Sequence, residues 1–403
     1  MTSPLEILKP LRRNIDSIIG EDELFAQLAS GRSLRIKYGV DCTAPDLHLG
    51  HAVNLWMMRH LQEHGHRVVF LLGDTTTQIG DPTGKSETRP VLSRKEIDRN
   101  ALAFIDQVSL VLHTEPDVFE VRRNSEWFDA MPVTELLSLF SMTTHAQLMS
   151  RDMFRERMAA GREIALHELT YPVLQGYDSF AMGSDLTIVG SDQLFNEMMG
   201  RHYQQRLGAI PQTLITTRIT PGLDGGPKQS KSLGNYVALL DDPAEKFGKL
   251  MSLPDTLVEE WAAAYTDMTE ENIERLAEAV SERGAKARDA KLELAEQIVG
   301  RYHGSEAATR SREEFLSTFS DRNEPDQMPV ITVSTRSVLP LDLVRLARPD
   351  LSNNALRRLL AQRAVRIDGN VILEGSTIVL EPGSVLRIGP RAWWRIGSGE
   401  KER

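Results

Sequence analysis

The sequence has few of the features that mark secreted or membrane proteins. It contains a single cysteine, Cys42, in 403 residues, which excludes an intrachain disulfide and a zinc site built from several cysteines. Apolar runs such as Val68–Leu72 are far shorter than the roughly 20 residues of a membrane-spanning helix. The opening stretch MTSPLEILKPLRRNID carries scattered charges and no apolar signal core. We therefore expect a reduced, cytoplasmic protein with no membrane partner.

Glycine and proline are also too scarce for a collagen-like or low-complexity chain, at 28 and 19 residues. Hydrophobic residues at 41% and charged residues at 26% are typical of globular proteins. At about 150 residues per domain, this length predicts two to three domains. The net charge of −10 argues against a general affinity for nucleic acid, and we expect no DNA partner.

Strand and helix patterns alternate in the first half of the chain. The β-rich run 33–40 is followed by helical apolar spacing over 50–65 and by a buried strand over 67–73. Strand, helix and strand of these lengths form a βαβ unit, which favours a parallel sheet. Further strands are expected at 118–123, 184–190 and 212–219.

The second half changes character twice. The pattern is helical and charged from about Pro243 to Thr318, and the polar segment 320–329 is typical of a linker. Helices are then expected near 341–346 and 353–360, followed by a hairpin over 364–372, where Asp-Gly-Asn separates β-branched residues. We place the domain boundaries at 1–235, 236–325 and 331–403.

The charge is unevenly distributed between these parts. Residues 331–403 carry a net charge of +5, which leaves −15 for the rest. Basic residues gather on and beside the second expected helix of this segment: Arg345, Arg348, Arg357, Arg358, Arg363 and Arg366. A solvated basic face is the simpler interpretation, but the contrast in sign favours an RNA-binding surface.

The segment DCTAPDLHLGH (41–51) lies between the first expected strand and the first expected helix. A helix N-terminus attracts phosphate through its free N–H groups, and His48 and His51 could stabilise charge on a transferring phosphoryl group. Gly50 between them would let a flat ligand approach the backbone. A metal site on one helical face and an unspecialised loop are the alternatives.

A second segment, PKQSKSLGN (227–235), places Lys228 and Lys231 in a stretch rich in glycine, proline and serine. Such a cationic loop could close over a polyphosphate, although two loop lysines are usually only solvated charge. The lysine segment indicates a phosphate site only in combination with the histidine segment.

Together these segments resemble a known family. HLGH resembles the HIGH signature and KQSKS the KMSKS signature of class I aminoacyl-tRNA synthetases, in the right order on a βαβ frame. YPVLQGYD (171–178) and GSDQ (190–193) resemble the bacterial tyrosyl branch. The resemblance implies an α/β fold with a Rossmann-like parallel-sheet catalytic domain, a helical domain on the anticodon side and a small α+β RNA-binding domain. It further implies a homodimer, formed through the segment around 125–165.

The implied reaction joins tyrosine to tRNA(Tyr) through a tyrosyl-adenylate. It uses ATP as a substrate together with Mg²⁺, and it implies no tightly bound cofactor or resident metal. His48, His51, Lys228 and Lys231 are expected to stabilise the transition state, while Lys85 and Arg89 match basic residues near the pyrophosphate. The resemblance assigns ATP binding to Gly39, Asp41, Thr43, His48, Gly50, His51, Gly190, Asp192, Lys228 and Lys231. It assigns contacts with tRNA to Arg357, Arg358 and Arg363.

The tyrosine site is expected on a helix whose first turn contains Pro172. Tyr171, Gln175 and Asp178 are spaced i, i+4 and i+7 and therefore share one face, where three polar groups suggest a polar ligand. By resemblance Asp178 accepts the phenolic hydroxyl, which excludes phenylalanine, an exclusion for which tyrosyl-tRNA synthetases are themselves the standard example. Asp81, Tyr171 and Gln175 would hold the α-amino group, and Gln193 would lie near the carboxyl group.

Some positions depart from the family pattern. Cys42 stands where proline is usual, Thr77 and Val189 stand where glycine is common, and Gln229 replaces the methionine of KMSKS. Lys37 occupies a position where many members place a second tyrosine, although one branch also has lysine. These departures leave two alternatives open: a paralogue that charges a modified tyrosine or feeds a biosynthetic pathway, and an RNA-binding protein without catalysis.

Overall fold

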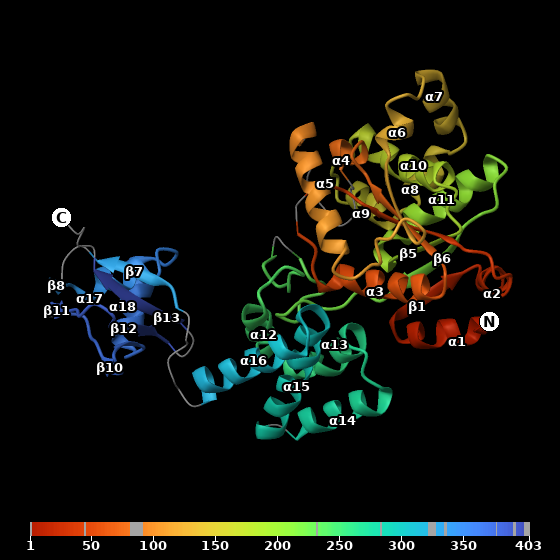
Figure 1. Cartoon of the computed structure of the whole chain (residues 1–403). Helices are drawn as coiled ribbons and strands as arrows, with labels where there is room; N and C mark the ends of the chain where they lie inside the picture. The colour runs from red at the N-terminus through yellow and green to blue at the C-terminus, as the bar shows by residue number, and fades with distance from the viewer. Residues whose placement is uncertain are drawn as a thin grey trace. The chain divides into compact units, whose positions relative to one another are not determined.

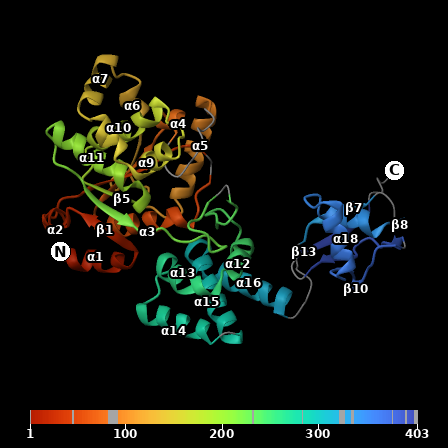
Figure 2. The ribbon, with the colours of Figure 1, turned by 180° about the vertical axis from the view of Figure 1, so that it is seen from behind.

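The computed structural model describes residues 2–43, 46–80, 92–230, 233–282, 284–320, 328–333, 337–375, 377–389 and 392–398. The chain divides into two units, Met1–Ser305 and Glu306–Arg403. Figures 1 and 2 show the ribbon from opposite sides.

A six-stranded sheet organises the first unit, in the order β1-β6-β5-β2-β3-β4. The strands are β1 Ile15–Ile19, β2 Arg35–Val40, β3 Arg67–Leu72, β4 Phe119–Arg123, β5 Leu186–Gly190 and β6 Thr213–Thr217. β2 to β6 pair in parallel, which confirms the parallel sheet and its predicted strands. β1, which the sequence did not reveal, pairs antiparallel with β6 at one edge.

Helices connect and cover these strands (Figure 1). Before β5 they are α1 Pro4–Leu8, η1 Lys9–Asn14, α2 Glu21–Ala29, α3 Leu49–Glu63, α4 Thr76–Ile79, α5 Arg94–Val108, α6 Ser125–Phe128, α7 Val133–Ser141, α8 His145–Met149, α9 Asp152–Ala159 and α10 Leu166–Ala181. After β5 come η2 Ser191–Gln193 and α11 Leu194–Arg206. Local sequence explains some of the starts. Ser93 and Glu96, for example, form a reciprocal capping box before α5.

The remainder of the first unit is helical, as the charged periodic sequence predicts. It contains α12 Pro243–Met251, η4 Asp255–Leu257, α13 Val258–Tyr265, α14 Glu270–Ser281 and α15 Gly284–His303. Phe247, Trp261 and Tyr265 are buried between these helices. In both views this group lies at the end of the unit opposite α6 and α7 (Figures 1 and 2).

The second unit begins with α16 Ser305–Phe315 and η5 Leu316–Ser320 and continues as a small α+β domain. Its elements are β7 Val330–Val333, β8 Ser337–Val338, α17 Pro340–Ala347, α18 Asn353–Ala361, β9 Val365–Ile367, β10 Asn370–Val371, β11 Ile378–Val379, β12 Val385–Ile388 and β13 Ala392–Ser398. The expected hairpin is confirmed as β9 and β10.

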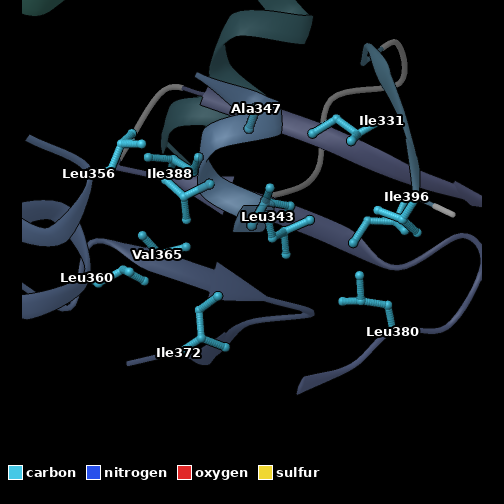
Figure 3. Packing of buried hydrophobic residues seen from close by; sticks show 13 residues of the cluster. Ile331, Leu343, Ala347, Leu356, Leu360, Val365, Ile372, Leu380, Ile388 and Ile396 are labelled. Atoms are coloured by element: carbon cyan, nitrogen blue, oxygen red, sulfur yellow. The ribbon is translucent and has the colours of Figure 1, made fainter. Parts of the chain in front are cut away.

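Two sheets and two helices enclose the core of the second unit. The larger sheet has the order β10-β9-β12-β13-β7, and β11 pairs with β8. Leu343 of α17 and Leu356 and Leu360 of α18 are completely buried in a cluster that includes Ile388 and Ile396 of the sheet (Figure 3). Among the described residues of the whole chain, no helix is both long and apolar enough to span a bilayer.

Candidate active site

The predicted nucleotide residues gather at the carboxyl ends of two neighbouring strands. Gly39 lies in β2 with Asp41 just beyond its end, whereas Gly190 ends β5 and Asp192 follows it. The chain moves from β2 to β3 and β4 on one side, then returns to place β5 on the other side of β2. Parallel α/β sheets bind ligands at this kind of reversal, because the two loops diverge there. Thr43 lies on the loop that leaves β2.

His48 immediately precedes α3, and His51 lies in its first turn. The backbone N–H of His48 donates to His51 Nδ1 at 3.3 Å, and the two ring centroids are 3.9 Å apart. A methyl group added at Gly50 would lie 3.1 Å from the His48 ring, so glycine leaves this turn open. The first turn of α3 therefore presents two half-buried imidazoles at the N-terminus of a helix, an arrangement that suits an anion.

The histidine segment is joined to the chain that follows the lysine segment. Leu49 N–H donates to the Val237 carbonyl at 3.0 Å, and Leu239 N–H donates to the Leu47 carbonyl at 2.9 Å. His48 forms an antiparallel bridge with Ala238 between these two bonds. The histidine signature and the strip 237–239, which follows the lysine signature, lie about 190 residues apart in sequence. Backbone hydrogen bonds hold them side by side.

Lys228, the first lysine of that segment, reaches across to the β5 loop. Its Nζ lies 3.6 Å from Asp192 Oδ2, and both side chains remain partly exposed. An exposed pair at this distance contributes little to stability and is easily exchanged for a charged ligand. Lys231, Asp81, Lys85 and Arg89 lie outside the described residues.

The helix α10 carries the predicted tyrosine residues, but it begins earlier than the sequence suggested. It starts at Leu166, so Pro172 lies inside the helix rather than in its first turn, and that prediction is wrong. A Cβ at Gly176 would lie 2.8 Å from the Tyr203 ring, so glycine allows α11 to pack closely on α10. This packing fixes Gln175 and Asp178 on either side of Gly176.

Asp178 is a carboxylate in the interior of the unit, 2% exposed. Trp127 Nε1 donates to its Oδ1 at 3.0 Å, and Asn124 Nδ2 lies 3.4 Å from its Oδ2. Burial raises the pKa of the Asp178 carboxyl to about 7, against the opposing effect of the Lys37 ammonium. With these two neutral donors among the residues that the structure describes, the buried carboxylate has capacity for a further hydroxyl donor.

Lys37 and Glu197 form a buried ion pair next to Asp178. Lys37 Nζ lies 2.8 Å from Glu197 Oε2 and donates to Ser179 Oγ at 2.8 Å. Gln175 Nε2 donates to Glu197 Oε1 at 2.7 Å. This orients the Gln175 amide and leaves its buried Oε1 without a partner among the described residues. An unpaired acceptor of this kind suits an ammonium group.

Asp41 connects the nucleotide residues with α10. Its carboxylate accepts from Tyr171 OH at 3.1 Å and from Thr76 Oγ1 at 2.9 Å. Tyr171 is therefore tied to the end of β2 rather than simply packed as a ring. Gln193, the last residue of η2, accepts from Asn196 Nδ2 at 3.0 Å.

Two of the departures from the family pattern contact each other. The Cys42 N–H donates to Thr77 Oγ1 at 2.8 Å, and both residues are buried. Proline at 42 would lack this donor and glycine at 77 would lack this acceptor. The two unusual residues therefore form a matched pair, and burial raises the pKa of the Cys42 thiol to about 12. Val189 is buried in β5.

Sequence reasoning missed several residues of this site. Asp74 is fully buried at the end of β3, where it accepts from the Ser125 N–H at 2.9 Å and lies 3.1 Å from Arg94. Asn124 and Trp127 support Asp178 from the end of β4, although Trp127 falls within the segment predicted to form a subunit interface. Only their position after a strand could have signalled them, because single polar residues in loops are common.

The predicted RNA residues belong to the second unit and are exposed. Arg357 and Arg358 lie on α18, and Arg357 Nε lies 2.8 Å from Glu374 Oε1. Arg363 follows α18 with a φ of +58°, in the left-handed region that favours glycine. Their exposure keeps them accessible to phosphate groups.

Comparisons with known proteins agree with this arrangement. A model of the class I tRNA synthetases for tryptophan and tyrosine matches residues 29–320. The tyrosine–tRNA ligase of Thermotoga maritima is 41% identical over 403 residues, covering 100% of both chains. That of Francisella tularensis is 38% identical over 398 residues, covering 98% of this chain and 99% of the relative.

Solved structures show the same fold at lower identity. A truncated mitochondrial tyrosyl-tRNA synthetase of Coccidioides posadasii is 23% identical with a TM-score of 0.62, over 78% of this chain and 92% of that one. The enzyme of Archaeoglobus fulgidus, solved with L-tyrosine, is 22% identical with a TM-score of 0.57, over 76% and 98%.

Proposed function

The chain belongs to the class I tRNA synthetases for tryptophan and tyrosine, and from that membership we propose that it ligates tyrosine to tRNA(Tyr) at the site described above. The reaction consumes ATP and passes through an enzyme-bound tyrosyl-adenylate. Full-length similarity to tyrosine–tRNA ligases supports tyrosine over a modified amino acid and an active enzyme over an inactive binding protein.

One observation carries the proposal for the site. The histidine segment is paired through the backbone at 47–49 with residues 237–239, which directly follow the lysine segment, beside the ends of β2 and β5. This pairing brings His48, His51 and Lys228 to the strand ends where a nucleotide would bind.

In the first step, the tyrosine carboxylate attacks the α-phosphorus of ATP. A new oxygen–phosphorus bond forms while the bond to the β-phosphate oxygen breaks, and pyrophosphate leaves with that electron pair. His48, His51, Lys228 and Lys231 stabilise the charge that develops, and Lys85 and Arg89 stabilise the pyrophosphate. In the second step, a hydroxyl of the terminal tRNA adenosine attacks the adenylate carbonyl and releases AMP. Positioning and electrostatics suffice for both steps.

ATP lies along the ends of β2 and β5 in this proposal. Gly39 and Gly190 leave room for the nucleotide, Asp192 accepts from the ribose hydroxyls, and Gly50 lets the base approach α3. Asp41 and Thr43 lie on the loop nearest the phosphates. Mg²⁺ would arrive with ATP as part of the substrate.

Tyrosine lies along α10. Asp178 accepts its phenolic hydroxyl, whereas Gln175 Oε1, Tyr171 and Asp81 receive its ammonium group and Gln193 lies near its carboxylate. The buried Lys37–Glu197 pair supports both ends, because it contacts Gln175 directly and its ammonium lowers the pKa of Asp178. A phenylalanine ring would not supply the hydroxyl donor that the Asp178 carboxylate receives from tyrosine, at a cost in binding.

The remaining parts handle RNA and assembly in this proposal. The domain 236–325 lies on the anticodon side of the tRNA, and Arg357, Arg358 and Arg363 of the domain 331–403 contact its phosphates. The segment 125–165 forms the interface of a homodimer, supported by exposed apolar side chains at Val133 and Leu137. A cytoplasmic location follows from the role in protein synthesis.

Pyrophosphate exchange into ATP, measured with the amino acid varied, tests the substrate. We expect exchange with tyrosine and none with phenylalanine or tryptophan. Exchange with a ring-modified tyrosine but none with tyrosine would overturn the proposal in favour of a paralogue, and RNA binding without exchange would overturn it in favour of a binding protein.

A further inference from the structure

Gln229 stands in the lysine segment where the family signature has methionine, and its side chain is buried beneath the site. Only 6% of its surface is exposed, whereas its neighbours Lys228 and Ser230 are more accessible. A long polar side chain buried from a loop requires hydrogen-bond partners. Its partners therefore show what the side chain does.

The Gln229 amide uses both of its polar atoms. Its Nε2 donates to the Tyr265 hydroxyl at 2.6 Å, and its Oε1 lies 3.4 Å from the Val237 N–H. Val237 is the residue whose carbonyl accepts from Leu49 N–H. One side chain thus connects the lysine segment, the strip that pairs with the histidine segment, and the helix α13.

Tyr265, which accepts the hydrogen bond from Gln229, is itself held in place by several contacts. It is 1% exposed, its ring packs edge-on against Trp261 at 4.9 Å, and its hydroxyl also bonds Thr220. Its carbonyl accepts from Arg301 at 3.1 Å, and the Arg301 guanidinium lies 3.8 Å from the centre of the Trp56 ring on α3. The hydroxyl of Tyr265 therefore has little freedom to move.

A second contact places Gln229 next to the histidines. A methyl group added at Gly50 would lie 3.7 Å from Gln229 Nε2, so the amide lies under the first turn of α3. From the other side, Asn235 holds the same loop by accepting from the Ser230 N–H at 2.8 Å and by donating to the Lys228 carbonyl at 3.2 Å. The backbone of Lys228 is thus held between Asn235 and Gln229.

We propose that Gln229 is a positioning residue, which anchors the Lys228 loop to Tyr265 of the helical region and so sets the lysine against the histidines. This inference rests on the proposed function, because it assigns Lys228 to the transition state. Methionine could fill the same space but could form neither hydrogen bond. In this chain the loop therefore depends on a polar contact with α13.

The test compares Gln229→Met, Tyr265→Phe and the double variant in tyrosine-dependent pyrophosphate exchange. We expect kcat to fall about 10- to 100-fold in each single variant, since a misplacement of about 1 Å can cost that much. The KM for tyrosine should stay within about twofold, because neither residue contacts α10. The double variant should lose clearly less than the two single losses combined, because both substitutions remove the same Gln229–Tyr265 hydrogen bond.

Tyr203→Phe is the matched control. Tyr203 is also fully buried, and its hydroxyl bonds the Leu139 carbonyl and the Thr143 hydroxyl. Neither partner belongs to the Lys228 loop. The substitution removes only the hydroxyl and keeps the ring that packs against Gly176, so it should lower the melting temperature and leave kcat unchanged. Single-variant kcat values within twofold of the parent, or losses that add in the double variant, would overturn the proposal.

Hydrogen exchange of the full chain separates this inference from the proposed function. Amides in 228–238 should exchange faster in Gln229→Met and in Tyr265→Phe than in the parent, whereas those in α5 should not. If the parent showed no pyrophosphate exchange with tyrosine, the proposed function would be wrong. The hydrogen-exchange measurement would still show whether Gln229 and Tyr265 anchor the loop. Unchanged protection of 228–238 in either folded variant would overturn the anchoring.

Discussion

The two units place their charged side chains in opposite ways. In the first unit Asp178, Lys37 and Glu197 are buried and bonded to one another or to fixed donors. In the second unit Arg357, Arg358 and Arg363 are exposed around a small apolar core. The difference indicates two kinds of recognition, since a small ligand is selected by buried polar groups and RNA is held by accessible cations.

The net charge conceals this contrast. The chain carries −10 overall, yet residues 331–403 carry +5 and the rest carries −15. The acidic part places Lys228 beside the proposed phosphate positions. The basic part has the sign that an RNA backbone requires. Each unit should therefore depend on its own kind of charge.

The largest effect should come from the imidazoles of the first unit. The double substitution His48→Ala and His51→Ala removes two donors from the proposed transition state. We expect kcat for pyrophosphate exchange to fall about 10³-fold or more, since one such donor is worth about 10²–10³. Affinity for tRNA should not change, as measured by filter binding. Full exchange activity in the folded variant would refute the assignment of the site.

Asp178→Asn tests the buried carboxylate. We expect kcat/KM for tyrosine to fall about 10- to 100-fold, because a hydrogen bond to a charged group is worth about 1.5–3 kcal/mol. In the parent, kcat/KM should rise as the pH rises through about 7, the raised pKa of Asp178, because the carboxylate is the stronger acceptor. The variant should lack this rise, and a persisting rise would contradict the assignment.

The same substitution has a consequence for stability with a definite sign. Because burial raises the pKa of Asp178 above its ordinary value of 3.8, folding favours the protonated form. The contribution of this group to stability is therefore present below about pH 4 and is lost as the pH rises through about 7. The difference in melting temperature between Asp178→Asn and the parent should therefore shift in favour of the variant between pH 5 and pH 8, as measured by thermal unfolding.

Thr77→Ala tests the matched pair at the floor of the site. It leaves the buried Cys42 N–H without an acceptor, so we expect the free energy of unfolding to fall by about 1–3 kcal/mol. Thr77→Ser keeps the hydroxyl and serves as the control. In a Cys42→Pro background, which has no N–H at residue 42, Thr77→Ala should lower the free energy of unfolding by less. Equal costs in both backgrounds, from denaturant titrations, would show that the contact is not the cause.

The smallest effect is expected at Arg363, where stability and RNA binding should oppose each other. Because its φ is +58°, Arg363→Gly should raise the free energy of unfolding by about 0.5–1 kcal/mol. It should also lower the salt dependence of tRNA binding by about one unit of slope, as expected for one lost phosphate contact. Arg363→Ala should lose the same contact without the gain in stability. Unchanged binding in both variants would exclude a role with RNA.

Much of the fold followed from local pattern. The runs 33–40 and 67–73 were predicted as strands because β-branched and apolar residues dominate them, and both lie in the sheet. The edge strand β1 was missed because Ile15–Ile19 mixes polar and apolar residues and follows a charged segment. Pro172 was placed in a first turn because proline is favoured there, yet α10 begins a full turn earlier.

The site was predictable only where residues cluster in the sequence. HLGH, KQSKS and the spacing of Tyr171, Gln175 and Asp178 were visible, because each motif lies within a few residues. The partnerships of Asp178 with Trp127, and of Cys42 with Thr77, join loops from different strands. Only the fold brings such residues together, so local sequence patterns do not predict these contacts.

The central claim is that chemistry and RNA binding depend on separate charges. It is tested most directly by measuring pyrophosphate exchange and tRNA charging in one preparation of the double variant Arg357→Glu and Arg358→Glu. We expect kcat/KM for tRNA in charging to fall about 100-fold, since two phosphate contacts reverse sign. Exchange with tyrosine should stay within about twofold of the parent. Loss of exchange in parallel with charging, in a folded variant, would contradict the account.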